Sequence, residues 1–468
     1  MSGRIDDSSP AAGSPRTDDS SPKQPSVPTG RGRSGGDAPR KRAHLNLFVY
    51  GCGHHKGAWR APGSAVGRLG EIEYYEGLAR TAERGLLDAV FFADGQSLDA
   101  PSLGDSPGWF LEPLTTLSAM ARATERIGLV STVSSTFYTP YHAARLLASL
   151  DHISRGRAGW NVVTSMFDVE ARNHGMPAMP PHERRYERAE EFIDVVQALW
   201  SSWPGASLEA DRSGRYVDPE LIRDVAHAGE HFSVAGALNV PEPPQGRPVL
   251  FQAGASGPGR DLAARHAEGI YAVAYDLEQG VAYREDVRRR IGAAGRDPDD
   301  VVVMPGLVAY VGSTEAEARR KQAALDELLP AEASLRQLSR FVGRDCSGWE
   351  LDAPVPELAP LEEFTGPQGR YATILRIVAS ERPTVRQLLG RLAAGGGHCT
   401  MVGTPESIAD RIEEWLDRGG ADGFNLMPPS LPGGLEDFVD HVVPELQRRG
   451  RFRTEYEGTT LRGHLGQR

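Results

Sequence analysis

An α/β fold, a (β/α)8 TIM barrel with long insertions, is the architecture that this 468-residue sequence predicts. Short apolar segments alternate with helix-like segments from residue 44 onward, a pattern typical of parallel sheets built from right-handed crossovers. The pattern occurs eight times, which is the number of strands in such a barrel. Polar residues follow several of the apolar segments, at the end where this architecture places its chemistry.

The eight apolar segments are the expected strands. They are short and mostly apolar, as strands buried on both faces of a sheet are. The fourth lies within 156–165, a segment that is apolar in its middle and ends in a run of polar groups. In chain order the segments are 45–50, 89–93, 127–133, 156–165, 249–252, 270–275, 301–311 and 423–427.

Helical periodicity marks the connections between these strands. The expected helices cover 73–87, 114–125, 141–153, 182–200, 260–266, 314–328 and 407–417. Two insertions interrupt the alternation: 201–247, with an antiparallel hairpin expected at 229–234, and 330–398, with mixed helix and loop. An open doubly wound sheet is the rival architecture, although it rarely uses eight strands in this order.

The N-terminal segment 1–42 differs in composition from the rest of the chain. It is rich in Ser, Pro, Gly, Asp and Arg and has too little apolar surface to offset the entropy of ordering. We expect a disordered tail followed by one domain, 43–468, that contains the insertions at about 201–247 and 330–398. The tail lacks the apolar core of a signal peptide, and its basic end, at 40–42, is interpreted as a solvated linker.

Charge and cysteine usage narrow the class of protein. A net charge of −11 argues against nucleic acid as a main partner, because phosphate binding needs a basic surface. No apolar run approaches the ~18–20 residues of a membrane span, so we expect no membrane partner. Cys52, Cys346 and Cys399 are too few for a disulfide framework in so long a chain, which favours a reducing, cytoplasmic location.

Polar side chains at the predicted strand ends are the first candidate site. Asp94 ends an apolar segment, where a carboxylate either caps the next turn or contacts a ligand. Thr132 and Asn161 lie near the ends of the third and fourth segments. Because the strand ends of a barrel surround one opening, we expect these side chains to face it. Other polar residues there lie at 134–136, 164–165 and 254–256.

The segment 252–260 follows the fifth strand and opens a helix. Its small residues would let a phosphate approach the backbone, and the helix start favours an anion. Ser256 can donate a hydroxyl and Arg260 a charge. A plain strand–helix turn would use the same glycines, so both interpretations stay open. His182 and Tyr186, one helical turn apart, share a face, as they also would in an ordinary amphipathic helix.

Cys52, His54 and His55 crowd together after the first strand. Thiolate and imidazole groups bind metals, but the spacing matches no standard zinc pattern, and we expect no metal site. An acid–base or substrate-pocket histidine and a structural loop remain the two other interpretations. Ser165 and Ser256 lack the Gly-x-Ser-x-Gly context of a hydrolase nucleophile.

Short motifs extend from about residue 44 to the C-terminus, at 53–55, 57–60, 91–94, 149–152, 159–165, 171–173, 182, 185–186, 229–232, 252–256 and 461–462. As a set they resemble the bacterial luciferase-like flavin monooxygenases. The resemblance is to the branch with nitrilotriacetate monooxygenase, dibenzothiophene sulfone monooxygenase, pristinamycin synthase and long-chain alkane monooxygenase. The N-terminal tail lies outside it.

This resemblance implies an FMN-dependent monooxygenase on a TIM barrel, with the flavin ring over strands two to four. His54, His55 and Asn161 are the residues expected to steer or protonate the reacting oxygen, and the pKa of a histidine near ~6.5 suits that work. The residues implied to hold FMN are Asp94, Thr132, Asn161, His182, Tyr186 and Ala255, with Arg185, Ser256 and Gly257 near the phosphate.

The implied function is a two-component FMNH2-dependent monooxygenase. It would insert one oxygen atom from O2 into a small organic substrate through a flavin C4a-peroxide. No second dinucleotide motif is visible, so we expect a separate NAD(P)H-dependent flavin reductase to supply reduced FMN. The family implies a homodimer or homotetramer, and long insertions on the active face suggest a sizeable or capped substrate.

Three other functions stay open. A deazaflavin-dependent oxidoreductase would share the barrel but transfer hydride without O2. A non-catalytic flavin-binding protein would use the same slot. A metal-dependent barrel hydrolase has only Cys52, His54 and His55 in its favour. The identity of the substrate is not readable from the sequence.

Overall fold

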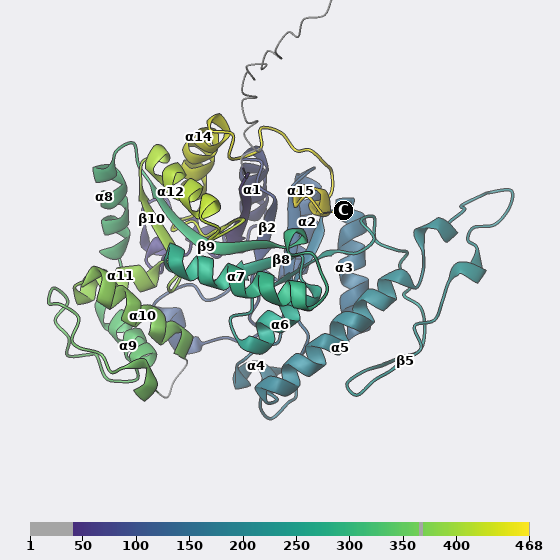
Figure 1. The fold of residues 1–468 in the computed structure, drawn as a ribbon, viewed down its shortest axis with the longest axis horizontal. Helices are drawn as coiled ribbons and strands as arrows, with labels where there is room; N and C mark the ends of the chain where they lie inside the picture. The colour runs from purple at the N-terminus through teal and green to yellow at the C-terminus, as the bar shows by residue number, and fades with distance from the viewer. Residues whose placement is uncertain (1–40, 365–367, 468) are drawn as a thin grey trace, which may run out of the picture. The chain divides into compact units, whose positions relative to one another are not determined.

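Eight parallel strands close into a barrel in the computed structural model, which describes residues 41–364 and 368–467 (Figure 1). Each strand pairs with the next around the ring, and the pairing of β8 with β9 closes it. The predicted (β/α)8 barrel is therefore confirmed, and the open doubly wound sheet is wrong. The strands are β1 (His44–Val49), β2 (Ala89–Phe92), β3 (Gly128–Ser134), β4 (Ala158–Val163), β7 (Val249–Gln252), β8 (Gly269–Ala272), β9 (Val302–Val311) and β11 (Gly423–Leu426).

A ninth strand, β10 (Cys399–Gly403), was not predicted. Leu307 pairs with Leu426 of β11 on one edge of β9 and with Cys399 on the other. β10 therefore continues along the edge of β9 that β8 occupies earlier. It follows three glycines at the end of the second insertion. Because glycines are typical of loops, a search for apolar segments does not identify the strand that follows them.

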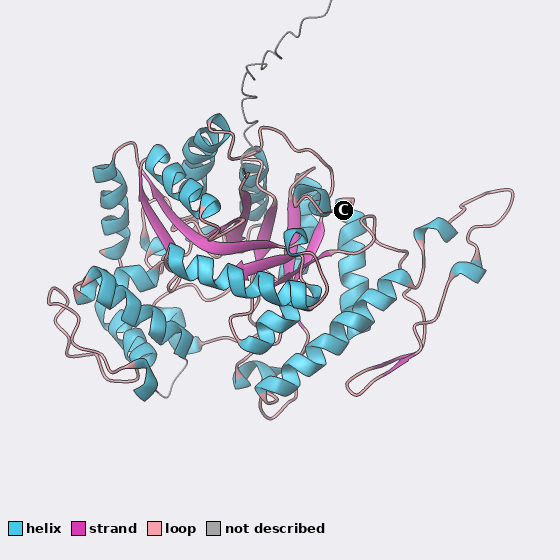
Figure 2. Ribbon diagram, in the orientation of Figure 1, coloured by secondary structure: helices cyan, strands magenta, loops and turns pink. Residues whose placement is uncertain are grey.

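Helices surround the strands, as Figure 2 shows. The seven predicted helices are confirmed with small shifts at their ends: α1 (Ile72–Arg84), α2 (Pro113–Ala123), α3 (Pro140–Ser154), α5 (His182–Ser201), α6 (Gly257–His266), α8 (Glu315–Asp326) and α12 (Pro405–Asp417). The sequence reasoning did not assign α4 (Asp168–Asn173), α7 (Leu277–Ala293), α13 (Gly433–Asp437), α14 (Val443–Arg448) and α15 (Leu461–His464). No helix among the described residues is long and apolar enough to cross a membrane.

The first insertion extends away from the barrel beside α5 (Figure 1). It contains the predicted hairpin, formed by the antiparallel strands β5 (His227–Ala228) and β6 (Ser233–Val234). The Glu191 carboxylate of α5 holds the turn, because it accepts hydrogen bonds from the backbone N–H groups of His231 and Phe232, each over 2.9 Å.

The second insertion has an apolar core of its own. It forms α9 (Ala331–Val342), α10 (Gln368–Glu381) and α11 (Val385–Ala393), which gather on one side of the barrel (Figure 1). Leu338, Tyr371, Ile374 and Leu388 are almost completely buried within this core. A self-supporting cluster of this kind can hold polar side chains at fixed positions beside the strand ends.

The C-terminal helix α15 closes the floor of the barrel. Leu461 is fully buried and joins the inward residues Val130 and Phe251 in one cluster. A Cβ on Gly128 would lie 2.5 Å from Leu461 Cδ1, and a Cβ on Gly159 would lie 2.9 Å from Leu461 Cδ2. The two glycines therefore leave the space that Leu461 fills, and the carboxyl end of the barrel is left for a ligand.

We expect substitutions of Gly159 and Leu461 to have non-additive effects on the free energy of unfolding, because the two residues are in contact at the floor of the barrel. Gly159→Ala should destabilise the protein by about 1–3 kcal/mol through overpacking. Leu461→Ala should cost ~2–5 kcal/mol through the cavity it leaves. In the double variant the added methyl meets less resistance, so the two costs should sum to more than the measured loss. Urea unfolding of the four proteins measures this.

Gly77→Ala is the matched control, because a Cβ at this position in α1 would meet nothing within 4 Å. It should leave the midpoint unchanged or raise it slightly, since alanine favours a helix over glycine. Strict additivity of Gly159→Ala and Leu461→Ala would contradict the floor contact.

Candidate active site

A hydrogen-bonded pair of side chains from adjacent strands lies at the mouth of the barrel. Thr132 of β3 and Asn161 of β4 are register partners, and Asn161 Nδ2 donates to Thr132 Oγ1 over 3.0 Å. The Thr132 hydroxyl donates to the Phe92 carbonyl over 2.8 Å, so it accepts from the amide, which fixes the orientation of Asn161. Asn161 Oδ1 is then buried without a hydrogen-bond partner among the described residues. A ligand N–H would satisfy it.

The hydroxyls farther along β3 and β4 hold the two following loops together. Ser134 Oγ and Ser165 Oγ share a hydrogen bond of 2.8 Å, and Thr136 Oγ1 donates to the Thr164 carbonyl over 2.8 Å. Ser165 has a φ of 53°, a left-handed conformation that this contact helps to maintain. These residues shape the mouth, and Asn161 adds a free acceptor to it.

A narrow turn free of large side chains starts helix α6. Ser256 is the N-cap and accepts from the Gly259 N–H over 3.2 Å, while its hydroxyl lies 3.5 Å from the Tyr186 hydroxyl. A Cβ on Gly254 would lie 2.6 Å from the Gly259 carbonyl carbon, and one on Gly259 would lie 3.0 Å from the Tyr186 oxygen. A Cβ on Gly257 would meet nothing within 4 Å. Backbone and hydroxyl groups thus dominate a helix start that favours an anion.

Arg260 is held within the chain. Its Nη1 forms an ion pair with Asp286 of α7 over 2.8 Å, and its Nε donates to the Ala255 carbonyl over 3.1 Å. The charge that the sequence offered to a phosphate is therefore balanced by a carboxylate. Ala255 contributes backbone to the turn, and its short side chain keeps the turn open.

The start of α5 brings His182, Arg185 and Tyr186 to the same side of the mouth. The His182 ring lies 4.9 Å from the Tyr186 ring. Arg185 donates to the Ser165 carbonyl and, over 3.1 Å, to the Pro180 carbonyl. Arg185 thereby ties the loop after β4 to the helix whose Tyr186 contacts Ser256.

Asp94 lies beside this mouth, in a cavity of about 420 Å³ among the loops after β2 and β3. Its Oδ2 accepts from Gln96 Nε2 over 3.1 Å. Burial raises the pKa of Asp94 above its usual value, and the nearby charges of Glu112 and Glu170 add to this effect. A ligand that donates a hydrogen bond would lower the cost of the buried carboxylate.

His54 is buried against the aromatic side chains of β1. Its Nε2 lies 2.9 Å from the Phe48 carbonyl, and its ring lies 4.5 Å from the Phe48 ring and 5.6 Å from the Tyr50 ring. A carbonyl only accepts, so Nε2 carries the proton and Nδ1 has a free lone pair. Burial lowers the pKa of His54 to about 3, which keeps the ring neutral at physiological pH.

His55 uses both ring nitrogens within the chain. Nδ1 accepts from the Gly57 N–H over 3.0 Å, so Nε2 donates to Asp326 of α8, also over 3.0 Å. His55 thus anchors the loop after β1 to α8, whereas His54 keeps a free nitrogen. In the part of the chain that the structure describes, no group of three or more His, Cys, Asp or Glu side chains could hold a metal ion.

A third histidine, His398, was missed by the sequence reasoning. It precedes β10, and a Cβ on Gly306 of β9 would collide with its Nδ1, which is buried without a hydrogen-bond partner among the described residues. Burial, followed by the charge of Arg370, lowers the pKa of His398 to about 4. When protonated, His398 would in turn lower the pKa of His54. The three glycines at 395–397, all with positive φ, were the available signal, because they permit the tight backbone that brings the ring there.

Large apolar side chains are exposed around the same opening. Val273 continues the inward alternation of Gly269 and Tyr271 on β8 and is 52% exposed. Exposed apolar side chains clustered at one end of a barrel indicate a place where a ligand excludes water. The others on loops that follow strands β1, β2 and β4 are Tyr50, Leu98, Leu103, Trp109, Met166, Phe167 and Val169.

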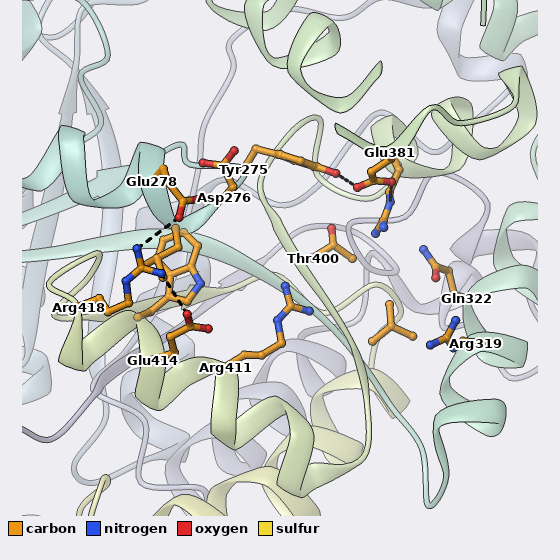
Figure 3. Close-up of a pocket in the computed structure, with 14 residues that line it drawn as sticks. Tyr275, Asp276, Glu278, Arg319, Gln322, Glu381, Thr400, Arg411, Glu414 and Arg418 are labelled. Atoms are coloured by element: carbon orange, nitrogen blue, oxygen red, sulfur yellow. Dashed lines mark hydrogen bonds and ion pairs between the residues drawn. The ribbon is translucent and has the colours of Figure 1, made fainter. Parts of the chain in front are cut away.

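A second cavity, of about 510 Å³, lies among β10, α7, α8 and α12 (Figure 3). Its carboxylates are paired: Glu278 and Glu414 with Arg418, and Glu381 with Arg391. None of the residues predicted to bind FMN lines it. The strand-end mouth is therefore the place where the predicted residues come together.

Comparison with known proteins agrees with this geometry. Residues 48–423 match a family described as luciferase-like monooxygenases. The matched segment runs from β1 to the start of β11 and includes both insertions. It therefore spans the strand ends that surround the mouth.

Individual relatives extend the likeness over most of the chain. The sequence is 46% identical over 440 residues to nitrilotriacetate monooxygenase component A of Aminobacter aminovorans, covering 91% of this chain and 96% of that protein. It is 43% identical over 429 residues to N-acetyl-S-(2-succino)cysteine monooxygenase of Bacillus subtilis strain 168, covering 91% and 97%. Among solved structures, DmoA from Hyphomicrobium sulfonivorans matches with a TM-score of 0.82 at 34% identity, covering 91% of this chain and 92% of that one.

The two buried histidines should make the stability of the protein depend on pH. The pKa values of His54 and His398 are about 3 and about 4 in the folded protein, against an ordinary 6.5. Below pH 6.5 the unfolded chain binds protons that the folded protein does not, so stability is lost as the pH falls toward 4. The slope is about 1.4 kcal/mol per pH unit for each histidine.

We expect His398→Gln to flatten the fall in the free energy of unfolding between pH 6 and pH 4, as measured by urea titration at each pH. His441→Gln, at an exposed position, is the control and should leave the slope unchanged. If the free energy of unfolding falls with pH equally steeply in His398→Gln and in the unmodified protein, His398 is not neutral in the folded protein.

Proposed function

The chain belongs to the luciferase-like monooxygenase family, and from this membership we propose that its barrel mouth binds reduced FMN and oxygenates a small organic substrate. The protein is a flavin-dependent monooxygenase, the oxygenase component of a two-component system. Its own residues determine how the cofactor is held, where water is excluded and which group handles the proton.

The observation that carries the FMN proposal is the unpaired, buried Asn161 Oδ1 at the mouth of the barrel. A flavin ring is flat, is mostly apolar and has an N–H group on its polar edge. Such a ring fits a site that offers an unpaired buried acceptor to its polar edge and apolar side chains to its faces. Phe167 and Val273 supply part of this apolar rim. The amide of Asn161 is prevented from turning away by its bond to Thr132.

The phosphate end of FMN fits the start of α6. Gly254 and Gly259 pack closely against each other, whereas a Cβ on Gly257 would meet nothing within 4 Å, so an anion could reach the first backbone N–H groups of the helix there. Ser256 and Tyr186 place two hydroxyls beside it. We assign the remaining FMN contacts to Asp94, His182, Arg185, Ala255 and Gly257, which surround the same opening.

Bound reduced FMN would supply the electrons for the activation of O2. The chain contributes a neutral imidazole: His54 donates from Nε2 to the Phe48 carbonyl and keeps Nδ1 free to accept a hydrogen bond from the reacting group. Asn161 orients the ring edge, and the apolar rim keeps water out of the slot. His55 holds the loop that carries His54 in place.

We further propose a separate NAD(P)H-dependent flavin reductase as partner. The relative that is 46% identical is named a component A, which denotes one part of a multi-component enzyme. The names of the two relatives also suggest trial substrates, since nitrilotriacetate and N-acetyl-S-(2-succino)cysteine each contain three carboxyl groups. The homodimer or homotetramer and the cytoplasmic location stay predictions.

Oxygen-isotope labelling tests the function. The purified protein is supplied with FMN, a purified flavin reductase, NADH and 18O2, together with either trial substrate. We expect a product that contains one 18O atom and forms only when the protein and reduced FMN are both present. If the protein binds a reduced deazaflavin but not FMN, the oxidoreductase alternative is correct instead.

Loss of a hydroxyl at the phosphate end should weaken FMN binding. Ser256→Ala and Tyr186→Phe should each raise the dissociation constant of FMN about tenfold, because a hydrogen bond to a charged group contributes roughly 1.5–3 kcal/mol. Fluorescence quenching of FMN measures this constant.

Thr314→Ala is the matched control, because Thr314 caps α8 as Ser256 caps α6. It should lower stability by about 1 kcal/mol, as loss of a cap does, without changing the FMN affinity. Unchanged affinity in both Ser256→Ala and Tyr186→Phe would place the phosphate elsewhere.

A further inference from the structure

The loop after β1 is joined to the end of the second insertion. The Lys56 N–H donates to the Ala393 carbonyl over 3.1 Å, and His55 forms a β-bridge with Ala394. The Lys56 ammonium donates to Gln337 of α9. Lys56 therefore extends from the loop that carries His54 toward α9, at the edge of the barrel mouth.

Two arginines of the insertion face the same region. Arg340 lies three residues after Gln337 on α9, so the two share a helix face. The guanidinium of Arg370, on α10, lies 4.5 Å from the centre of the Phe341 ring. It also lies 3.3 Å from the position that a Cβ on Gly396 would take. The glycine segment 395–397 leads into His398, so Arg370 is beside the mouth.

The positive charges of these three side chains interact. Burial, followed by the charges of Arg370 and Arg340 in that order, lowers the pKa of Lys56 to about 8. Arg370 also lowers the pKa of His398. The three cations are therefore close enough to repel one another, and Arg370 acts in addition on a histidine next to the mouth.

No carboxylate balances the two arginines in the described residues. Neither Arg340 nor Arg370 forms an ion pair there, whereas Arg336, one turn earlier on α9, pairs with Glu332 over 2.7 Å and Asp105 over 3.4 Å. Asp105 is also the carboxylate whose charge acts on Lys56. Two arginines held beside a lysine without ion pairs of their own cost free energy, and perturbed charged groups of this kind are concentrated at functional sites.

We propose that Lys56, Arg340 and Arg370 bind the carboxylates of the substrate, and that the substrate is a small polycarboxylate anion. This inference rests on the proposed monooxygenase function and names its substrate class. A guanidinium forms two parallel hydrogen bonds with a carboxylate, so two arginines and a lysine suit an anion with two or three carboxylates. The rest of the molecule would extend over Gly396 toward His398 and the flavin slot.

Because the protein is negatively charged overall, a polycarboxylate substrate needs a local group of positive charges to bind. A chain with a net charge of −11 repels a polyanion over most of its surface. The three cations reverse the field at the edge of the mouth. They lie on the insertion side, whereas the cofactor residues Tyr186 and Ser256 come from α5 and α6, so both ligands can bind together.

Binding of a small tricarboxylate by the FMN-loaded protein tests the inference. The probe is propane-1,2,3-tricarboxylate, and its uncharged trimethyl ester is the comparison, with calorimetry as the measurement. We expect the acid to bind at least tenfold more tightly than the ester, with an affinity that falls as salt is added. If the acid does not bind more tightly than the ester, the proposal is wrong.

Substitution of the cations locates the site. Arg340→Gln and Arg370→Gln should each weaken tricarboxylate binding about tenfold, and the double variant more, with unchanged FMN affinity. Arg386→Gln, at an arginine of the same insertion that is paired with Asp352, should leave tricarboxylate binding unchanged. Unchanged binding in the double variant overturns the proposal.

The same variants separate this inference from the proposed function. If Arg340→Gln and Arg370→Gln weaken FMN binding instead, the cations hold the phosphate of the cofactor, and the substrate assignment fails while FMN binding stands. If the unmodified protein binds no FMN, the proposed function fails first. Thermal unfolding midpoints equal to that of the unmodified protein confirm that each variant is folded.

Discussion

The hydrogen bond between Thr132 and Asn161 lies at the boundary between the apolar, packed part of the barrel interior and its polar mouth. Below it, Gly128 leaves space for Leu461 and Val130 is fully buried. Above it, the inward positions carry hydroxyls and amides. Every second residue of a barrel strand points inward, so a register shift by one residue would send the whole polar set outward. The site therefore depends on the register between β3 and β4, in which Thr132 and Asn161 are partners.

The mouth has two sides of different origin. The start of α5 and the start of α6 supply backbone and hydroxyl groups, of which Tyr186 and Ser256 are in contact. The second insertion supplies histidine and cations, with His398 and Arg370 placed by the glycines at 395–397. The first side is built from elements of the barrel itself. The second is built from an insertion with an apolar core of its own.

The eight strands could be predicted because they are local patterns, and so could the strand-end positions of Asp94, Thr132 and Asn161. What could not be predicted depends on partners far apart in sequence. Arg260 looked free for a phosphate because Asp286 lies on α7, a charged helix that periodicity did not reveal. His55 looked catalytic because its partner Asp326 lies 271 residues away.

The sequence could not predict the position of His398 either. Its three preceding glycines are a local signal, but its contact with Gly306 joins residues that are far apart in the sequence. That position also brings His398 within reach of the charge of Arg370. Burial lowers the pKa of His398 first, and the positive charge of Arg370 lowers it further. If a substrate carboxylate binds at Arg370 as proposed, it would offset that charge and raise the pKa of His398. His398 would then accept a proton more readily with substrate bound than without it, and substrate binding would be coupled to proton transfer.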